Sequence, residues 1–179
     1  MTLDQGENAV LKLMDEYGDG SQLDEELLAR MPELFDMAQK QLAQLQRIVR
    51  TAEIGAESRE YPLPEDCAKV FRVWEGDETT RKWVQRGKTL LFSSPKARVL
   101  EYFATPETIT EDTAETYEFE VSEEAAACMP SFVAASLLST DMVQSGRELM
   151  TLYSTMLAAL ETDLPRSDGK GGVKQTLWR

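Results

Sequence analysis

The chain has 179 residues and a formal charge of −13, with 32 acidic residues, 19 basic residues and no histidine. Its length suits one ordinary domain with a buried core. The charge disfavours binding to nucleic-acid backbones, which relies on Lys and Arg, and the lack of histidine excludes Ser-His-Asp and Cys-His nucleophile pairs. The first residues, MTLDQGENAVLKLM, show no basic n-region or long apolar run, and no later segment approaches the roughly 20 apolar residues of a membrane span. We therefore expect a soluble protein, with no membrane contact, made in a reducing cytoplasm.

The segment DEYGDGSQLDEE at 15–26 resembles a calcium-binding EF-hand loop. Four positions of that motif are filled, by Asp15, Asp19, Gly20 and Glu26. Tyr17, however, stands at a ligand position that its phenol cannot serve, and no second loop follows to form a pair. We interpret the segment as a turn between helices and expect no calcium binding at physiological levels.

Helical spacing of apolar residues predicts helices at about 7–17, 23–51, 123–141 and 146–162. Pro32 divides the second of these into a short helix and a long one, since proline suits the first turn of a helix but not its interior. Ser122 is the expected N-cap of the third, and Pro130 predicts a restart or a kink within it. In the last helix Leu149, Tyr153, Met156 and Leu160 form an apolar stripe, which we expect to pack against the stripe from Leu34 to Ile48.

Between these helices, residues about 67–121 predict several short strands, such as AKVFRVW, ARVLEYFA and ETYEFEVS. Their close spacing favours an antiparallel meander over βαβ units. The expected fold class is therefore α+β and mainly α, a helical bundle with an inserted antiparallel β-meander in a single domain, 1–164. Residues 165–179 lose all periodicity and predict a flexible tail.

Few residues have the type and spacing of a catalytic, metal-binding or phosphate-binding site. Cys67 and Cys128 are interpreted as small buried thiols, because two isolated cysteines cannot form a Cys-rich zinc site. The GKGG sequence at 169–172 lacks the strand-loop-helix context and the spacing of a phosphate-binding loop. With no nucleophile pair, metal set or fingerprint loop, we expect no enzymatic activity and no cofactor.

Charge is unevenly distributed along the chain. Basic residues crowd into the predicted meander, whereas 101–124 contains nine acidic residues and no basic one. The surface is therefore bipolar, and its two unlike patches could meet in a contact between subunits. That candidate contact joins four bases to three acids, namely Arg81, Lys82, Arg86 and Lys88 with Glu115, Glu118 and Glu120.

The order of several segments resembles the head-to-tail adaptor, or head-completion, proteins of tailed bacteriophages, a family that includes tail tubular protein A. These segments are RMPELFDMAQKQLAQLQRIVR, YPLPEDCAKVFRVW, VLEYFATPETITEDTAETYEF, MPSFVAASLLSTD and RELMTLYSTMLAAL, which together cover about 28–160. The resemblance implies an adaptor-like helical bundle with an inserted β element. It also implies a ring, often of about twelve copies, that joins the portal of the head to the tail around the DNA exit channel. No catalysis is implied, the expected partners are portal and tail proteins, and the expected location is the virion.

The basic tail adds a further candidate contact, since Val173, Leu177 and Trp178 provide apolar anchors that a solubilising tail does not need. We expect this tail to order on a neighbouring subunit or on the portal. An alternative function stays open on the sequence alone. The chain would then be a monomeric acidic regulator or DNA mimic that binds one basic protein through Glu101 to Glu124.

Overall fold

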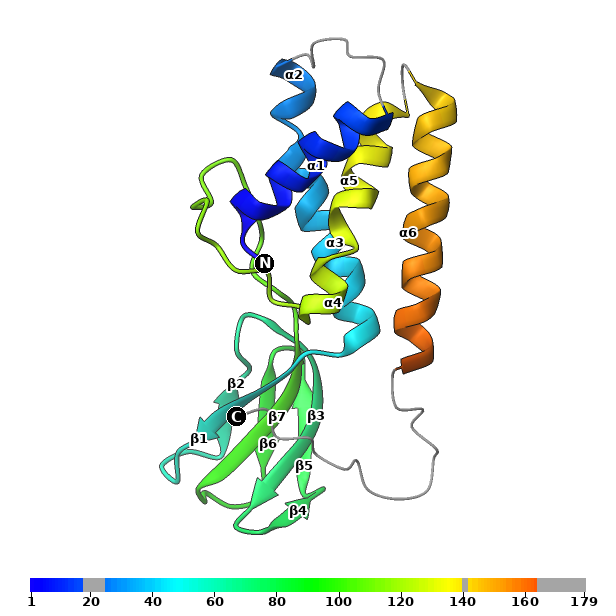
Figure 1. The fold of residues 1–179 in the computed structure, drawn as a ribbon. Coiled ribbons are helices and arrows are strands. Elements are labelled where there is room, and N and C mark those ends of the chain that lie inside the picture. Colours follow the sequence, from blue (N-terminus) through cyan, green and yellow to red (C-terminus); the bar gives the residue numbers. More distant parts are fainter. Residues whose placement is uncertain (18–24, 140–141, 164–179) are drawn as a thin grey trace.

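The computed structural model of the protein describes residues 1–17, 25–139 and 142–163. Within them the fold is mixed α+β with more helix than strand, which confirms the predicted class. The helices gather at one end of the molecule and the strands at the other (Figure 1). Among the described helices, none has the length and apolar content needed to cross a membrane.

The described helices follow the predicted order but not all of the predicted limits. They are α1 Leu3–Tyr17, α2 Glu25–Leu28, α3 Met31–Gln46, α4 Glu123–Ala126, α5 Met129–Leu138 and α6 Val143–Asp163. Helix α1 starts earlier than the expected residue 7 because Thr2 and Gln5 form a capping box. The Gln5 amide donates to Thr2 Oγ1 at 3.3 Å, and the Thr2 amide donates to Gln5 Oε1 at 3.0 Å.

Two of the predicted helical segments are interrupted near prolines. Pro32 and Pro130 lie in the first turns of α3 and α5, where a missing amide hydrogen costs nothing. The helical segment predicted at 123–141 restarts near Pro130, as expected, and consists of α4 followed by α5. Ser122 is the N-cap of α4, as predicted, and its Oγ accepts a hydrogen bond from the Ala125 amide at 3.2 Å.

The prediction that the long helix reaches residue 51 is wrong. Helix α3 ends at Gln46 because Arg47 adopts the left-handed conformation, with φ 54° and ψ 65°, and donates its amide to the Ala43 carbonyl at 2.9 Å. The chain then turns into strand β1, Val49–Ile54. The β-branched residues at 48, 49, 51 and 54 suit a strand better than a helix.

The β element spans residues 49–104 rather than the predicted 67–121. Its strands are β1 Val49–Ile54, β2 Glu60–Pro62, β3 Cys67–Glu75, β4 Glu78–Thr80, β5 Trp83–Arg86, β6 Thr89–Phe92 and β7 Arg98–Ala104. All pairings are antiparallel, as predicted, but they do not form a simple meander, since one sheet has the order β1-β7-β3-β4 and the other β2-β6-β5. The two sheets share one apolar core, to which Val73, Leu90 and Leu100 contribute side chains with no exposed surface.

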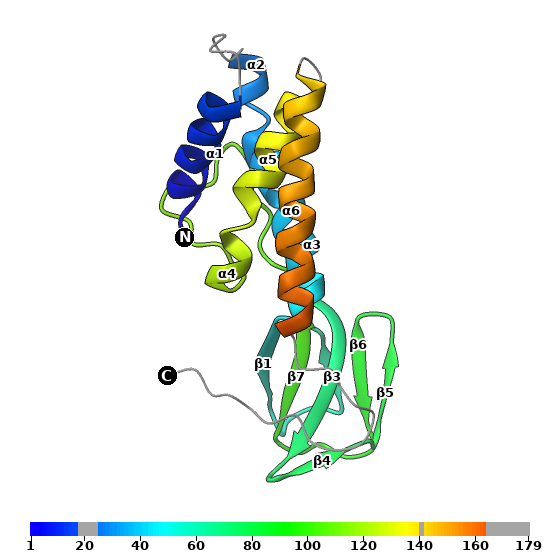
Figure 2. The same ribbon diagram turned by 45° about the vertical axis from the view of Figure 1, so that its right-hand side comes forward.

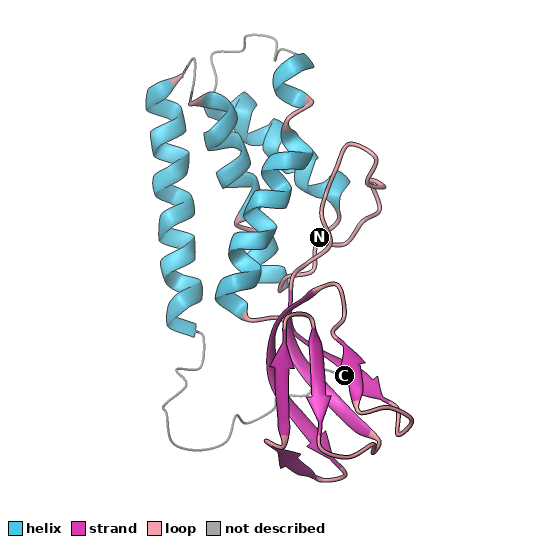
Figure 3. Ribbon diagram, turned by 180° about the vertical axis from the view of Figure 1, so that it is seen from behind, coloured by secondary structure: helices cyan, strands magenta, loops and turns pink. Residues whose placement is uncertain are grey.

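The predicted strand at ETYEFEVS is absent from the described structure, where residues 105–122 form a long loop along the helical bundle (Figures 1 and 3). An isolated bridge between Thr2 and Glu118 is its one strand-like feature. The alternating pattern has another cause, because Ile109 and Phe119 enter the helical core. The Phe119 ring stacks on Phe35 with 5.3 Å between ring centroids.

Helix α6 lies against α5, and not mainly against α3 as the sequence predicted (Figures 1 and 2). Gly146 permits the close approach, since a Cβ atom there would lie 3.1 Å from the Ala135 carbonyl oxygen. Tyr153 is 3% exposed and packs its ring on Phe132, with 5.2 Å between centroids. Its hydroxyl reaches α3 through a hydrogen bond of 3.1 Å to Gln41.

We predict that Tyr153→Ala lowers the free energy of unfolding by about 3 kcal/mol or more, as large-to-small core substitutions do. Tyr153→Phe keeps the ring contact and should lose only about 1 kcal/mol, the net value of one hydrogen bond. Leu152→Ala on the exposed face of the same helix is the control. Urea unfolding checks all three, and equal stability of the Tyr153→Ala variant and the parent would show that α6 does not depend on this contact.

Candidate functional site

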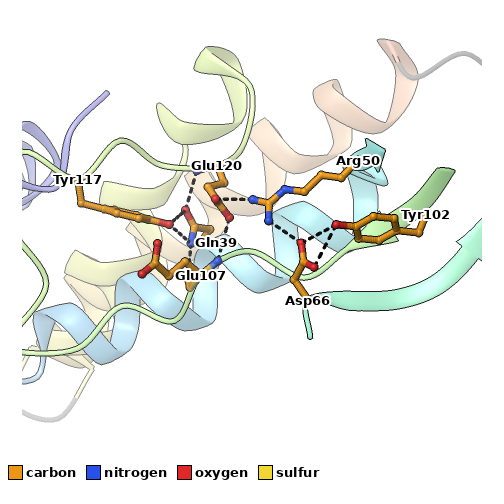
Figure 4. A network of polar contacts seen from close by, with 7 residues as sticks. All are labelled: Gln39, Arg50, Asp66, Tyr102, Glu107, Tyr117 and Glu120. Atoms are coloured by element: carbon orange, nitrogen blue, oxygen red, sulfur yellow. Dashed lines mark hydrogen bonds and ion pairs between the residues drawn. The ribbon is translucent and has the colours of Figure 1, made fainter. Parts of the chain in front are cut away.

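The helical core and the β core are separate apolar clusters, and a polar network joins the two parts of the molecule (Figure 4). Gln39 is its helical anchor, a polar side chain with no exposed surface in the middle of α3. Its amide nitrogen donates to the Glu107 carbonyl at 3.1 Å, and its amide oxygen accepts from the Glu120 backbone amide at 2.8 Å. Gln39 thus fixes both ends of the 105–122 loop to α3.

Arg50 continues the network into the β element. Its guanidinium donates to Asp66 Oδ2 at 2.6 Å and also binds the Glu120 carboxylate. Asp66 in turn accepts a hydrogen bond of 3.1 Å from the Tyr102 hydroxyl, and Glu120 accepts from the Glu107 amide at 2.8 Å. Four chain segments meet at the junction, namely β1, the β2–β3 loop, β7 and the 105–122 loop, and charge-assisted hydrogen bonds, which are stronger than neutral ones, hold them together.

The tyrosines at the two ends of the network are protected from ionisation. Burial, followed by the hydrogen bond to Asp66 and its negative charge, raises the pKa of Tyr102 to about 12. Burial also raises the pKa of Tyr117, whose hydroxyl lies 3.1 Å from Gln39 Nε2. Both phenols therefore stay neutral throughout the physiological range, which suits structural hydrogen bonding and not proton transfer.

A cavity of about 430 Å³ opens beside the junction, between α3 and the ends of β3 and β7. We call it the basic pocket, because Lys40, Arg47 and Lys69 line it and no acidic residue does. Lys40 is already paired with Asp36 at 2.7 Å. Among the described residues, neither Arg47 nor Lys69 forms an ion pair. In a chain of charge −13, two cations without a described partner in one cavity make it a candidate site for an anionic group.

The outer face of the sheet β1-β7-β3-β4 carries exposed apolar side chains next to that pocket. Phe71 and Phe103 lie 5.0 Å apart by ring centroid, and the Arg72 guanidinium covers Phe71 at 4.2 Å. Val49 pairs with Phe103 across the sheet and is 48% exposed. Phe103 also lines the basic pocket, so the apolar face and the pocket are continuous. Contiguous exposed apolar surface of this kind marks interaction sites.

The structure separates the four predicted interface bases. Arg81 and Lys82 connect β4 to β5, at the end of the β element that lies far from the helices (Figure 2). Arg86 and Lys88 flank the turn at the opposite end of β5, about 13 Å away along a strand of four residues. All four side chains are exposed and form no ion pair with a described residue.

Other bases of the β element are used internally. Arg98 is 4% exposed, binds Glu75 at 2.9 Å and donates to the Ser94 and Lys96 carbonyls at 3.1 Å each. Arg72 pairs with Glu101 at 3.0 Å. The crowding of bases in the sequence therefore overstates the free positive charge of the β element.

The predicted interface acids also differ in role. Glu115 and Glu118 are exposed on the 105–122 loop, next to the start of α1. The nearby Glu7 has a raised pKa, caused first by burial and then by the negative charges of Glu115 and Asp4. Glu120, in contrast, belongs to the junction network. Its place in the predicted interface stays a prediction, and the ion pair to Arg50 gives this carboxylate a use within the subunit that the sequence did not reveal.

Several predicted features fall outside the described residues. The EF-hand-like segment lies largely in 18–24, and the tail anchors Val173, Leu177 and Trp178 lie in 164–179. Of the two cysteines, Cys128 is buried as predicted, while Cys67 is half-buried, and burial raises the pKa of both thiols. The described residues contain no group of three or more side chains suited to hold a metal ion.

Comparison with known protein-family models and with curated proteins finds no match to this chain. The candidate sites therefore depend on the chemistry of their own residues. Two were missed at the sequence level, the junction network and the basic pocket. Gln39 alone left a signal, as a polar residue on a helix face that is otherwise apolar.

We predict that Gln39→Leu destabilises the protein by about 2–3 kcal/mol, because the Glu107 carbonyl and the Glu120 amide lose their partners. Gln44→Leu on the same helix is the matched control, since the Gln44 side chain is exposed. Chemical unfolding followed by circular dichroism measures both. Stability of the Gln39→Leu variant within 0.5 kcal/mol, roughly the scatter of surface substitutions, would contradict the role of Gln39.

A second prediction concerns alkaline pH. Tyr102 has a pKa of about 12 in the folded protein, against about 10 when unfolded, so the folded state binds more protons between these values and its stability falls as pH rises. When the pH rises from roughly 9 to 11, the free energy of unfolding of the Tyr102→Phe variant should fall by about 1 kcal/mol less than that of the parent. Urea unfolding at the two pH values tests this, and parallel losses in both proteins would rule out a protected Tyr102.

Proposed function

We propose that this chain is a structural subunit of the head-to-tail connector of a tailed bacteriophage, placed in the virion as part of a ring between portal and tail. The observation that carries the proposal is the arrangement of its parts. A helical bundle holds an antiparallel β element inserted between α3 and α4, which is the architecture that the resemblance over 28–160 implies.

The distribution of charge supports a subunit with several different neighbours. Residues 105–163 carry twelve acidic residues and one basic residue, whereas residues 49–104 carry nine acidic and ten basic residues. The helical part is therefore strongly negative, and the β element is nearly neutral with free cations at its surface. A connector subunit must bind a neighbouring copy, the portal above and a tail component below, so unlike surfaces are what it needs.

The exposed apolar face of the sheet β1-β7-β3-β4 supports the same proposal. Phe71 and Val99 are each more than a third exposed, and on the same sheet Arg72 forms an ion pair with Glu101. Exposed apolar side chains grouped on one face of a sheet are typical of protein-protein interaction sites. The acidic regulator or DNA mimic is the alternative, and it would act as a monomer.

Reconstitution with the portal protein of the same genome tests the proposal directly. Full-length chain is mixed with purified portal rings, and electron microscopy together with native mass spectrometry records the complexes. We expect a layer of this chain on one end of each portal ring, with many copies per ring. A monomer that leaves portal rings bare and forms a one-to-one complex with a basic protein would instead establish the regulator.

We predict that reversing Arg81 and Lys82 to Glu weakens assembly, because these bases are exposed at the far end of the β element and can attract acidic residues of a neighbouring subunit. The loss should be greater at low salt, where exposed charges are least screened. Lys12→Glu with Arg30→Glu changes the net charge equally on the helical part and is the control. Light scattering and portal binding measure assembly, and equal loss in both variants would indicate general charge repulsion.

A further inference from the structure

Two cations of the basic pocket, Arg47 and Lys69, have no anionic partner among the described residues, whereas Lys40 is paired with Asp36. Arg47 and Lys69 approach the pocket from the end of α3 and from β3, and no described carboxylate pairs with either of them. Phe103 and Thr105 complete the lining with an aromatic ring and a hydroxyl. A cavity of about 430 Å³ has room for a few side chains of a partner, and its two free cations select carboxylates.

The same chain presents carboxylates in a suitable form. The loop 105–122 stands out beside α1 (Figures 1 and 3), and its turn carries the exposed Glu111 and Asp112. The turn is already ordered, because the Thr110 amide donates to Thr113 Oγ1 at 2.9 Å and the Thr113 amide to the Thr110 carbonyl at 3.0 Å. An ordered turn loses little conformational entropy on binding, which favours its use as a ligand.

This acidic turn is held away from the pocket of its own subunit. Ile109 is buried in the helical core, and its amide donates to Asp36 Oδ1 at 3.0 Å. Phe119 anchors the other side of the loop in the same core. Neither Glu111 nor Asp112 forms an ion pair with a described residue. Free cations and free carboxylates therefore coexist on one chain, at two different places.

We infer that the basic pocket receives the acidic turn 110–113 of a second copy of this chain, with Glu111 and Asp112 paired to Arg47 and Lys69. Pocket and turn are unlike surfaces, so each copy uses one of them toward each neighbour and the contacts continue around a closed ring. The inference rests on the proposed ring and names the contact within it. In this arrangement the contact between pocket and turn is the principal contact between subunits. The contact predicted from the sequence, in which Glu115 and Glu118 pair with the bases of the β4–β6 hairpins, is then secondary.

Charge-swap complementation tests the inference on the full-length chain. Variant one carries Arg47→Glu and Lys69→Glu, and variant two carries Glu111→Lys and Asp112→Lys. Each alone places like charges at every contact, so self-association on its own and on portal rings should weaken by roughly tenfold or more. An equal mixture restores opposite charges at every contact in an alternating ring, and assembly should return. The controls Lys12→Glu with Arg30→Glu, and Glu53→Lys with Glu57→Lys, change net charge equally.

Zero-length coupling of carboxylates to amines gives a second readout that detects weak association. Parent chains labelled with heavy and light nitrogen are mixed, coupled and digested, and we expect links between chains that join Glu111 or Asp112 to Lys69. Assembly on the portal without these links and without complementation would overturn the inference while leaving the proposed function intact. A chain that does not self-associate at any concentration, even on portal rings, would overturn the inference as well. If mixing the two charge-swap variants restores self-association but the protein does not bind the portal, the inference is sustained and the connector role is contradicted.

Discussion

The polar junction between α3 and the β element is the constraint on which the rest of the structure depends. The chain crosses from helices to strands after Gln46 and back after Ala104, and the two apolar cores on either side do not merge. Apolar packing alone would leave the angle between the two parts poorly specified, because it is not directional. Gln39, Arg50 and Asp66 supply directional bonds instead. These bonds favour one arrangement of the two parts over others.

Periodicity in the sequence predicted the fold class and most helices, because burial dictates which residues recur on one face. It failed where a local backbone event decided the outcome. Helix α3 ends five residues before the predicted limit because Arg47 adopts the left-handed conformation, and the β element begins there. Arginine has no special preference for that conformation, so the sequence does not predict the turn. The alternation at 117–121 predicted a strand, yet Phe119 follows it into a helical core. The start of α1 was also missed, because the prediction from residue 7 did not use the capping box of Thr2 and Gln5.

Charges were harder to interpret than apolar residues, because a charged side chain has several uses that look alike in a sequence. Arg98 at the start of β7 is nearly buried, and its guanidinium closes the loop before that strand. Lys69 in β3, also within the β element, is exposed and forms no ion pair with a described residue. Glu120 and Glu118 are two residues apart, yet one belongs to the junction and the other lies at the surface. Only contacts distant in sequence separate these roles, so the composition of a segment overstates the charge that is available for partners.

In the proposed ring, a rigid junction and a contact between pocket and turn would work together. The pocket lies at the junction itself, where Thr105 and Pro106 line it before the chain enters the 105–122 loop, while the acidic turn lies further along that loop. Gln39 holds both ends of the loop to α3, so the receptor and the ligand of each subunit are fixed to one helix. The angle between successive copies would then be set by the fold, and a constant angle is what closes a ring instead of extending a filament. Each contact would neutralise two carboxylates and leave most of the acidic surface free, and such a surface repels the DNA backbone that the connector must let pass.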